Sequence, residues 1–193
     1  MLELPANTAL VLIDVQQGFL DPSWGERNNP QAEANIARLL SAWRENARPV
    51  FHVHHDSRSP QGCFRPGTPG NRPRPEVAPL PGEAVYHKHV NSAFIGTTLE
   101  GDLRAAGIET LVIVGLTTNH CVSTTARMAG NLGFATFVVS DATATFARKV
   151  LDGRLRSAQE VHDAALSDLN EEFAEIVTTE AALAAADAGC AAA

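Results

Sequence analysis

Residues 110–115 read TLVIVG, an apolar run that opens on a threonine and ends on a glycine. A short, continuous run of this kind is typical of a strand buried on both faces of a parallel sheet. It leads through the polar turn 116–120, LTTNH, into a helical pattern over about 120–131. A buried strand followed by a turn and a helix predicts a βαβ unit, the repeating element of doubly wound α/β folds.

The same alternation continues outward in both directions from this unit. The predicted strands occupy residues 9–13, 49–53, 84–86, 110–115, 135–139 and 173–177. The predicted helices occupy residues 31–47, 97–106, 120–131 and 157–171, with an alanine-rich helix after Thr179. Strands and helices in alternation, joined by right-handed crossovers, predict a three-layer α/β/α, Rossmann-like sheet of six parallel strands. We find no internal repeat and no second core, so the sequence predicts one domain over residues 1–193.

One segment departs from the alternation. Residues from about 56 to 82 hold most of the prolines, together with glycines and the arginines Arg58, Arg65, Arg72 and Arg74. Proline in this density excludes a helix or a central strand. A loop this long inside a compact domain is usually functional. We expect it to cover a site or to lie at a subunit interface, with its arginines either binding an anionic substrate or exposed to solvent.

Composition excludes several classes of partner. The 193 residues carry a net charge of −7, whereas nucleic-acid-binding and anionic-membrane-binding surfaces are basic. No stretch approaches the ~18 consecutive apolar residues of a membrane span, and the N-terminus lacks the basic start of a signal peptide. Cys63, Cys121 and Cys190 are odd in number and widely spaced, which predicts reduced thiols. We therefore expect a cytoplasmic protein.

Common catalytic motifs are missing. The sequence contains no GxGxxG, no GxxxxGK[ST], no GxSxG and no HExxH. The sequence therefore does not support four kinds of site: a dinucleotide fold of the usual type, a P-loop, a serine-hydrolase elbow or a zinc protease helix. The predicted architecture alone says nothing about chemistry.

Three reactive groups follow predicted strands. Asp14 ends the first strand, Lys88 follows the third, and Cys121 follows the turn after the fourth. Ligands of open parallel sheets bind outside the carboxyl ends of the strands, so a carboxylate, an amine and a thiol are expected at one edge. Cys121 near a helix start, with Lys88 nearby, is predicted to have a lowered pKa and to be partly thiolate. Asp14 is then the candidate base.

Each of these residues also has an ordinary structural interpretation. A lone cysteine is often a small buried apolar residue, an aspartate after a strand is often a turn residue, and a lysine there is often solvated. A binding or scaffold protein without turnover is therefore an alternative. Selective alkylation of Cys121 by iodoacetamide distinguishes the enzyme from the scaffold.

Three stretches of sequence resemble the isochorismatase-like cysteine hydrolase superfamily, which includes nicotinamidases, N-carbamoylsarcosine amidohydrolases and biuret hydrolases. They are LVLIDVQQGF at 10–19, HKHVNSAFIGTTLE at 87–100 and IVGLTTNHCVSTTARMAGNLGF at 113–134. The resemblance implies that Asp14, Lys88 and Cys121 are a catalytic triad. It also implies a cis peptide bond between Leu116 and Thr117, which directs the amides of Thr117 and Cys121 at an oxyanion.

The resemblance further implies a homodimer or homotetramer and no cofactor. True isochorismatases of the superfamily, which cleave a vinyl ether, lack the cysteine, so the presence of Cys121 disfavours that reaction. The expected reaction is hydrolysis of a C–N bond in a small amide, carbamoyl, ureido or lactam compound through a thioester. Candidate substrate contacts are Gln16, Phe19, Trp24, Asn91, Phe94, Asn119 and His120. Core packing is the alternative for the phenylalanines, and helix capping for Asn119 and His120.

A histidine cluster lies on and after the second strand. Nicotinamidases carry an Asp-x-His metal motif there, whereas this chain has His55 and Ser57 at those positions. His52 and His54 share one face of the strand, but a metal site needs further ligands. We therefore predict packed or hydrogen-bonded histidines and no metal. A metal-dependent nicotinamidase is the remaining alternative.

Overall fold

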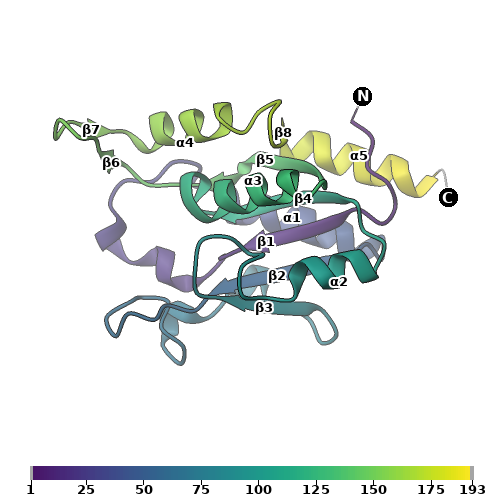
Figure 1. Ribbon diagram of the computed structural model, residues 1–193, viewed down its shortest axis with the longest axis horizontal. Helices are drawn as coiled ribbons and strands as arrows, with labels where there is room; N and C mark the ends of the chain where they lie inside the picture. The colour runs from purple at the N-terminus through teal and green to yellow at the C-terminus, as the bar shows by residue number, and fades with distance from the viewer. Residues whose placement is uncertain (1, 192–193) are drawn as a thin grey trace.

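The computed structural model describes residues 2–191, with side chains to residue 188. Its centre is a sheet of six parallel strands in the order β3-β2-β1-β4-β5-β8 (Figure 1). The strands are β1 Ala9–Ile13, β2 Val50–His55, β3 Ala84–Lys88, β4 Thr110–Leu116, β5 Ala135–Ala144 and β8 Glu175–Val177. The predicted fold class, a doubly wound six-stranded parallel α/β sheet, is confirmed.

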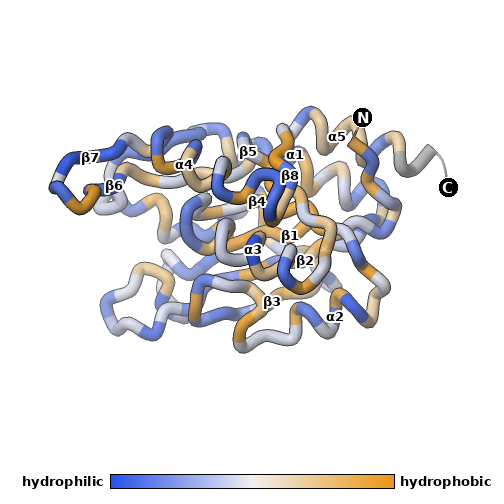
Figure 2. The backbone as a smooth tube through the Cα atoms, turned by 45° about the horizontal axis from the view of Figure 1, so that its top comes forward, coloured by the Kyte–Doolittle hydropathy of each residue, from blue (hydrophilic) through white to orange (hydrophobic). Residues whose placement is uncertain are grey.

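Helices cover both faces of the sheet because alternate strand residues face opposite ways. The helices are α1 Ala32–Glu45, α2 Leu99–Ala105, α3 Ser123–Asn131, α4 Ala158–Ser167 and α5 Thr179–Ala191. Leu10 and Leu12 of β1 pack in the core cluster that holds α1 and α5, whereas Val11 and Ile13 pack in the cluster under α2 and α3. Figure 2 shows these apolar strands at the centre of the molecule.

Strand order reverses between β1 and β4. From β1 the chain continues to β2 and β3 on one side, and from β4 to β5 and β8 on the other. Loops diverge at such a switch point and leave a crevice at the carboxyl ends of the strands. Asp14 follows β1 and Cys121 follows β4, so the topology brings both residues to this crevice.

Three local features differ from the prediction. A five-residue turn of π-helical geometry, Thr118–Val122, precedes α3, so the helix begins later than its sequence pattern suggested. Strand β5 continues to Ala144 past a register shift opposite β4. A two-stranded hairpin, β6 Arg148–Lys149 and β7 Leu155–Arg156, projects beside α4. Strands of two residues, rich in arginine, carry too little apolar alternation to be predicted.

The 56–82 segment forms no helix or strand apart from two short 3₁₀ turns, η3 Pro69–Asn71 and η4 Pro75–Val77. Two further 3₁₀ turns, η1 Gln17–Leu20 and η2 Pro22–Trp24, follow β1. Among the described residues, no helix is long and apolar enough to span a bilayer. The side chain of Cys190, for which we expected no catalytic role, lies outside the described part.

Candidate active site

Asp14, Lys88 and Cys121 meet at the carboxyl ends of β1, β3 and β4. The Lys88 ammonium donates to Asp14 Oδ2 at 2.7 Å and to Cys121 Sγ at 3.3 Å. Both Lys88 and Asp14 are almost completely buried. One ammonium group therefore joins the candidate nucleophile to the candidate base.

The backbone geometry at the strand ends sets this arrangement. Asp14 has a φ of 51°, a left-handed conformation in which the chain turns sharply out of β1. Gly115 of β4 has a φ of 120°, and a Cβ there would lie 2.0 Å from Ile13 O, so β4 approaches β1 only because this residue is glycine. The Leu116–Thr117 peptide bond that follows is cis, as the resemblance implies.

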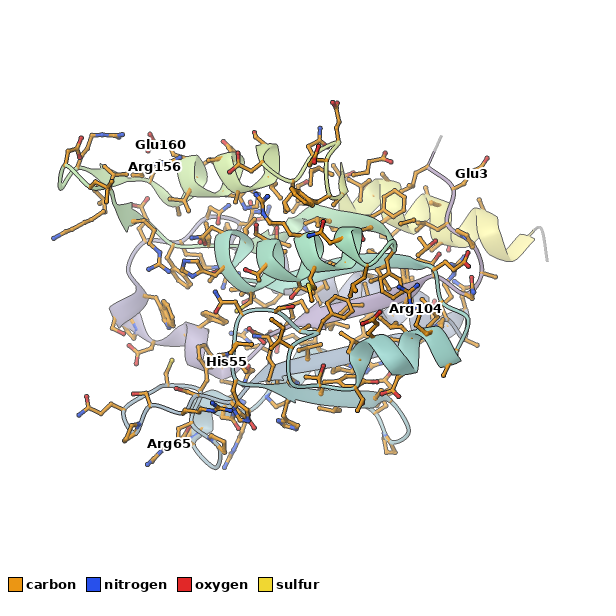
Figure 3. The ribbon with its side chains drawn as sticks, viewed as in Figure 1. Glu3, His55, Arg65, Arg104, Arg156 and Glu160 are labelled. Carbon is orange, nitrogen blue, oxygen red and sulfur yellow. The ribbon has the colours of Figure 1, made fainter. Side chains whose placement is uncertain are left out.

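Lys88 has a third partner that sequence reasoning did not place in the site. His55 Nδ1 lies 3.3 Å from Lys88 Nζ, so the three N–H donors of the ammonium meet three acceptors. Burial and the charge of Lys88 lower the pKa of His55, which keeps its ring neutral. Because Nδ1 accepts from Lys88, the ring carries its proton on Nε2. Figure 3 shows His55 below and to the left of the centre, at the end of the sheet nearest the 56–82 loop.

Asp14 is electrostatically suited to accept a proton. Burial raises its pKa, although the neighbouring Lys88 opposes the shift. Its second carboxylate oxygen, Oδ1, is buried and has no hydrogen-bond partner among the described residues. A buried oxygen without a partner is an expensive feature that a purely structural carboxylate avoids. Asp14 thus offers a free basic oxygen in the site.

The thiol of Cys121 does not have the lowered pKa that its position suggested. Burial and the negative charge of Asp14 raise its pKa to about 12, and Lys88 only partly opposes this. The sequence prediction was wrong because it counted the helix start and Lys88 but neither desolvation nor the nearby carboxylate. In the resting site the thiol is protonated, and Asp14 is the group placed to take its proton.

A cavity of about 190 Å³ opens onto these groups. Its lining comprises Asp14, Phe19, Trp24, His55, Phe64, Asn91, Thr117, His120 and Cys121. Phe19 lies against Phe64 and Trp24, with ring centroids 4.7 Å and 5.2 Å apart. The Trp24 indole is fixed by donating to Gly18 O at 2.9 Å. The cavity therefore has a polar reactive floor and a rigid aromatic wall.

Four of the seven predicted substrate contacts line this cavity: Phe19, Trp24, Asn91 and His120. Phe94 does not, because its ring stacks on Phe134 in the main core. Asn119 does not, because its side chain accepts from Thr145 Oγ1 at 2.5 Å. Phe94 is therefore a core residue, as the alternative interpretation held. Asn119 instead links the turn before Cys121 to Thr145, the residue that follows β5.

Gln16 is also outside the lining, yet it supports the site. Its side chain is buried, accepts from the backbone N–H of His55 at 2.8 Å and donates to His55 O at 3.1 Å. It also donates to Asn71 O at 2.8 Å in the 56–82 loop. Gln16 therefore holds His55 and the loop in place instead of contacting the cavity.

The 56–82 loop contributes one aromatic wall residue. Phe64 packs over Gly18, where a Cβ would come within 2.6 Å of the ring. Sequence reasoning missed Phe64 because a phenylalanine among prolines and arginines carries no periodic signal. None of the four loop arginines lines the cavity, and Figure 3 shows Arg65 on the outer edge of the molecule, away from His55.

The histidines on β2 have separate partners. His52 Nε2 lies 2.9 Å from Glu83 Oε2, and the His54 ring packs edge-on against His87 at 5.7 Å between centroids. Asp14, His55 and Cys121 do form a set of ligand atoms within 4.8 Å of one another. However, the Lys88 ammonium contacts all three, so a protein cation already lies where a metal ion would bind. These residues therefore do not fit a metal centre.

The fold and site define an α/β protein with a thiol, a carboxylate and an ammonium at the switch point of its sheet. The isochorismatase domain model matches residues 8–181, and the chain belongs to the isochorismatase family of hydrolases. YrdC, an isochorismatase-family protein of Bacillus subtilis, is 46% identical over 172 residues, covering 89% of this chain and 92% of YrdC. Nicotinamidase 3 of Arabidopsis thaliana is 32% identical over 183 residues, covering 88% of this chain and 83% of that protein.

The solved structures agree with the sequence comparison. The crystal structure of a hydrolase of the isochorismatase family from Chromobacterium violaceum superposes with a TM-score of 0.95 at 47% identity. The superposition covers 97% of each chain. The family resemblance seen in the three sequence stretches is thus confirmed.

Proposed function

We propose that this protein is a cysteine-dependent hydrolase that cleaves a C–N bond of a small amide, carbamoyl, ureido or lactam compound. The observation that carries the proposal is the bridging of Cys121 Sγ and Asp14 Oδ2 by the Lys88 ammonium at the floor of a cavity. The family's amide-cleaving members, such as the similar nicotinamidase, support the choice of bond.

The first half of the proposed reaction acylates the enzyme. Asp14 Oδ1, which has no other partner among the described residues, takes the thiol proton as Cys121 Sγ attacks the substrate carbonyl carbon. The amides of Thr117 and Cys121 stabilise the resulting oxyanion. Protonated Asp14 then gives the proton to the departing nitrogen, the C–N bond breaks, and a thioester remains.

The second half releases the product. Asp14, again a carboxylate, takes a proton from water as the water oxygen attacks the thioester carbonyl. Collapse of this intermediate breaks the C–S bond, and the proton on Asp14 returns to the sulfur. Lys88 keeps its charge throughout and stabilises the thiolate each time it forms.

The cavity favours a compact, uncharged substrate. Its volume of about 190 Å³ is below the ~300–1,000 Å³ of sites for drug-sized ligands. Aromatic rings form its wall, and Lys88, the cation nearest its floor, is already bonded to Asp14. A planar amide or ureide with few heavy atoms fits this description better than an anionic or extended compound.

A screen for ammonia release over small amides, carbamoyl compounds, ureides and lactams tests the proposal. The wild-type protein should hydrolyse at least one compound, and Cys121→Ala should abolish that turnover while keeping the fold. If Cys121→Ala retains turnover, the cysteine mechanism is wrong. Including nicotinamide with and without a chelator tests the metal-dependent nicotinamidase alternative, for which the position of Lys88 offers no support.

A non-catalytic binding protein on the same fold is the other alternative. It predicts no turnover of any compound in the screen, together with undiminished ligand binding in Cys121→Ala. The buried Asp14–Lys88 ion pair beside the Cys121 thiol argues against it, because burying charged groups costs free energy and serves no purpose in a scaffold.

We also propose that the protein works as a homodimer or homotetramer in a reducing cytoplasm. Cys63 and Cys121 are both free thiols, and the mechanism requires Cys121 to stay reduced.

A further inference from the structure

A second cavity, of about 560 Å³, lies between α3 and α4 beside the β6–β7 hairpin. Four cationic side chains line it: Arg127 from α3, Arg148 and Lys149 from β6, and Arg156 from β7. Figure 3 shows Arg156 next to Glu160, where the hairpin meets the start of α4. We call these four residues the basic cluster.

The basic cluster is only partly neutralised by the protein itself. None of its members forms an ion pair with a carboxylate among residues 2–188. Arg127 donates weakly, through Nη2 to Asp168 O and through Nε to Ser123 Oγ, each at 3.4 Å, and Arg156 Nη2 donates to Glu160 O at 2.8 Å, so neither guanidinium bonds a carboxylate. The Glu160 carboxylate bonds Ser157 and pairs with Arg154; these Ser157 bonds, and then the charges of Arg154 and Arg156, lower its pKa.

This gathering of positive charge is unusual for this chain. The protein has 15 Lys and Arg against 22 Asp and Glu, yet four cations surround one cavity to which Asp168 contributes the only acidic side chain. The guanidinium Nε of Arg148 is buried without a hydrogen-bond partner in the described part of the chain. Like charges brought together repel, and a buried donor without an acceptor is costly, so both features call for an anion.

We propose that this cavity binds a small multivalent anion, of the phosphate or polycarboxylate class. Guanidinium groups present paired N–H donors that match phosphate and carboxylate oxygens, and Lys149 adds a point charge. The volume admits an ion of this size with its first waters. The proposal concerns a site apart from the catalytic cavity and does not depend on the proposed reaction.

His120 provides a natural reporter of binding. Arg148 Nη2 lies 3.4 Å from His120 Nδ1, and His120 lines the catalytic cavity. An anion that draws the Arg148 guanidinium toward itself changes the charge next to this ring. The buried His162, which instead contacts Thr118 Oγ1 at 2.9 Å, serves as an internal reference.

The test is a titration of the full chain with inorganic phosphate, pyrophosphate and citrate at constant ionic strength, followed by calorimetry and by the histidine NMR resonances. We expect saturable binding of at least one of these anions, tighter for the more highly charged ones, with a shift at His120 and little at His162. Comparing the affinity for phosphate with that for citrate distinguishes the phosphate class from the polycarboxylate class. Chloride at the same ionic strength should not compete.

Variants decide whether the basic cluster is responsible. Lys149→Gln/Arg156→Gln should weaken binding about tenfold for each removed cation. Arg38→Gln/Arg58→Gln removes the same charge from exposed positions elsewhere and should bind as tightly as wild type. Equal binding by both double variants, or no saturable binding of any anion, overturns the proposal. The mass of each protein in solution is measured in parallel. If no anion binds and the Lys149→Gln/Arg156→Gln variant dissociates from an oligomer, the basic cluster serves self-association, and the proposal of an anion site is also overturned.

Discussion

Two carboxylates near opposite ends of β3 show how the same group serves structure or chemistry. Glu83, just before the strand, accepts from Arg44 Nε and Nη2 and from Leu80 N, each at 2.8 Å, and lies 2.9 Å from His52 Nε2. Asp14, beside the strand's last residue Lys88, has one partner at 2.7 Å and one oxygen with none among the described residues.

The pKa shifts of the two carboxylates run in opposite directions. Burial raises the pKa of Glu83, but the bonds from Arg44, Leu80 and His52 prevail and hold it at about 2. Burial raises the pKa of Asp14, and the single cation Lys88 does not outweigh it. A carboxylate with its acceptors filled is fixed in the charged form, whereas one left partly unsatisfied is able to exchange a proton.

The largest expected effect is on turnover. Asp14→Asn removes the proton acceptor, so kcat on a compound found in the ammonia-release screen should fall by about 10²–10⁴. Glu83→Gln removes a less deeply buried carboxylate at the other end of the strand and should leave kcat within about twofold. Normal turnover in Asp14→Asn would remove Asp14 from the mechanism, whatever the behaviour of Glu83→Gln.

Stability gives the next comparison. Lys88→Met leaves the Asp14 carboxylate buried without its cation, which should lower the free energy of unfolding by about 3–5 kcal/mol. The double variant Asp14→Asn/Lys88→Met removes both charges of this buried pair, so part of the lost free energy of unfolding should be recovered. Urea unfolding of the two variants measures the difference. A double variant less stable than Lys88→Met would show that the ion pair is not what Lys88 stabilises.

Alkylation of Cys121 distinguishes the effect of the Asp14 charge on the thiol pKa from the role of Asp14 as a base in turnover. The Asp14 carboxylate raises the thiol pKa, so Asp14→Asn, which keeps Lys88, should lower that pKa and increase the thiolate fraction. Iodoacetamide should therefore alkylate Cys121 about tenfold faster at pH 8 in this variant, although turnover is lost. Mass spectrometry of Cys121 against Cys63 follows the reaction. Slower alkylation than in wild type would mean that Asp14 acts as a base even toward this reagent.

Sequence reasoning reached the sheet and the three reactive residues for a simple reason. Strand ends are marked by the end of an apolar run, and in a parallel sheet every strand end lies at the same edge. The same reasoning failed for Gln16 and for the pKa of Cys121, because both depend on distances between segments far apart in the chain. Gln16 follows β1 as Asp14 does, yet its amide bonds His55 and Asn71 instead of facing the cavity.

His55 illustrates what the pattern left open. The position of His55 on β2 predicts a packed or hydrogen-bonded ring, and the ring does contact Lys88. That this contact lies in the site follows only from the pairing of β2 with β3, which the sequence pattern does not show. Phe64 likewise lies in the cavity wall because Gly18 leaves room for its ring, a close approach that no periodicity encodes.

The smallest expected effect belongs to Glu83 itself. Glu83→Gln should lower the free energy of unfolding by about 1 kcal/mol at pH 7, since the group is partly exposed and solvent weakens its ion pairs. The pKa of Glu83 in the folded protein, about 2, lies below the ordinary glutamate value of 4.5, so this stabilisation is complete above pH 4.5 and is lost as the pH falls toward 2. Urea unfolding at pH 7 and pH 3 should therefore show the gap between wild type and variant narrowing in acid. A gap that stays constant or widens would mean that Glu83 stabilises the fold through packing and not through its charge.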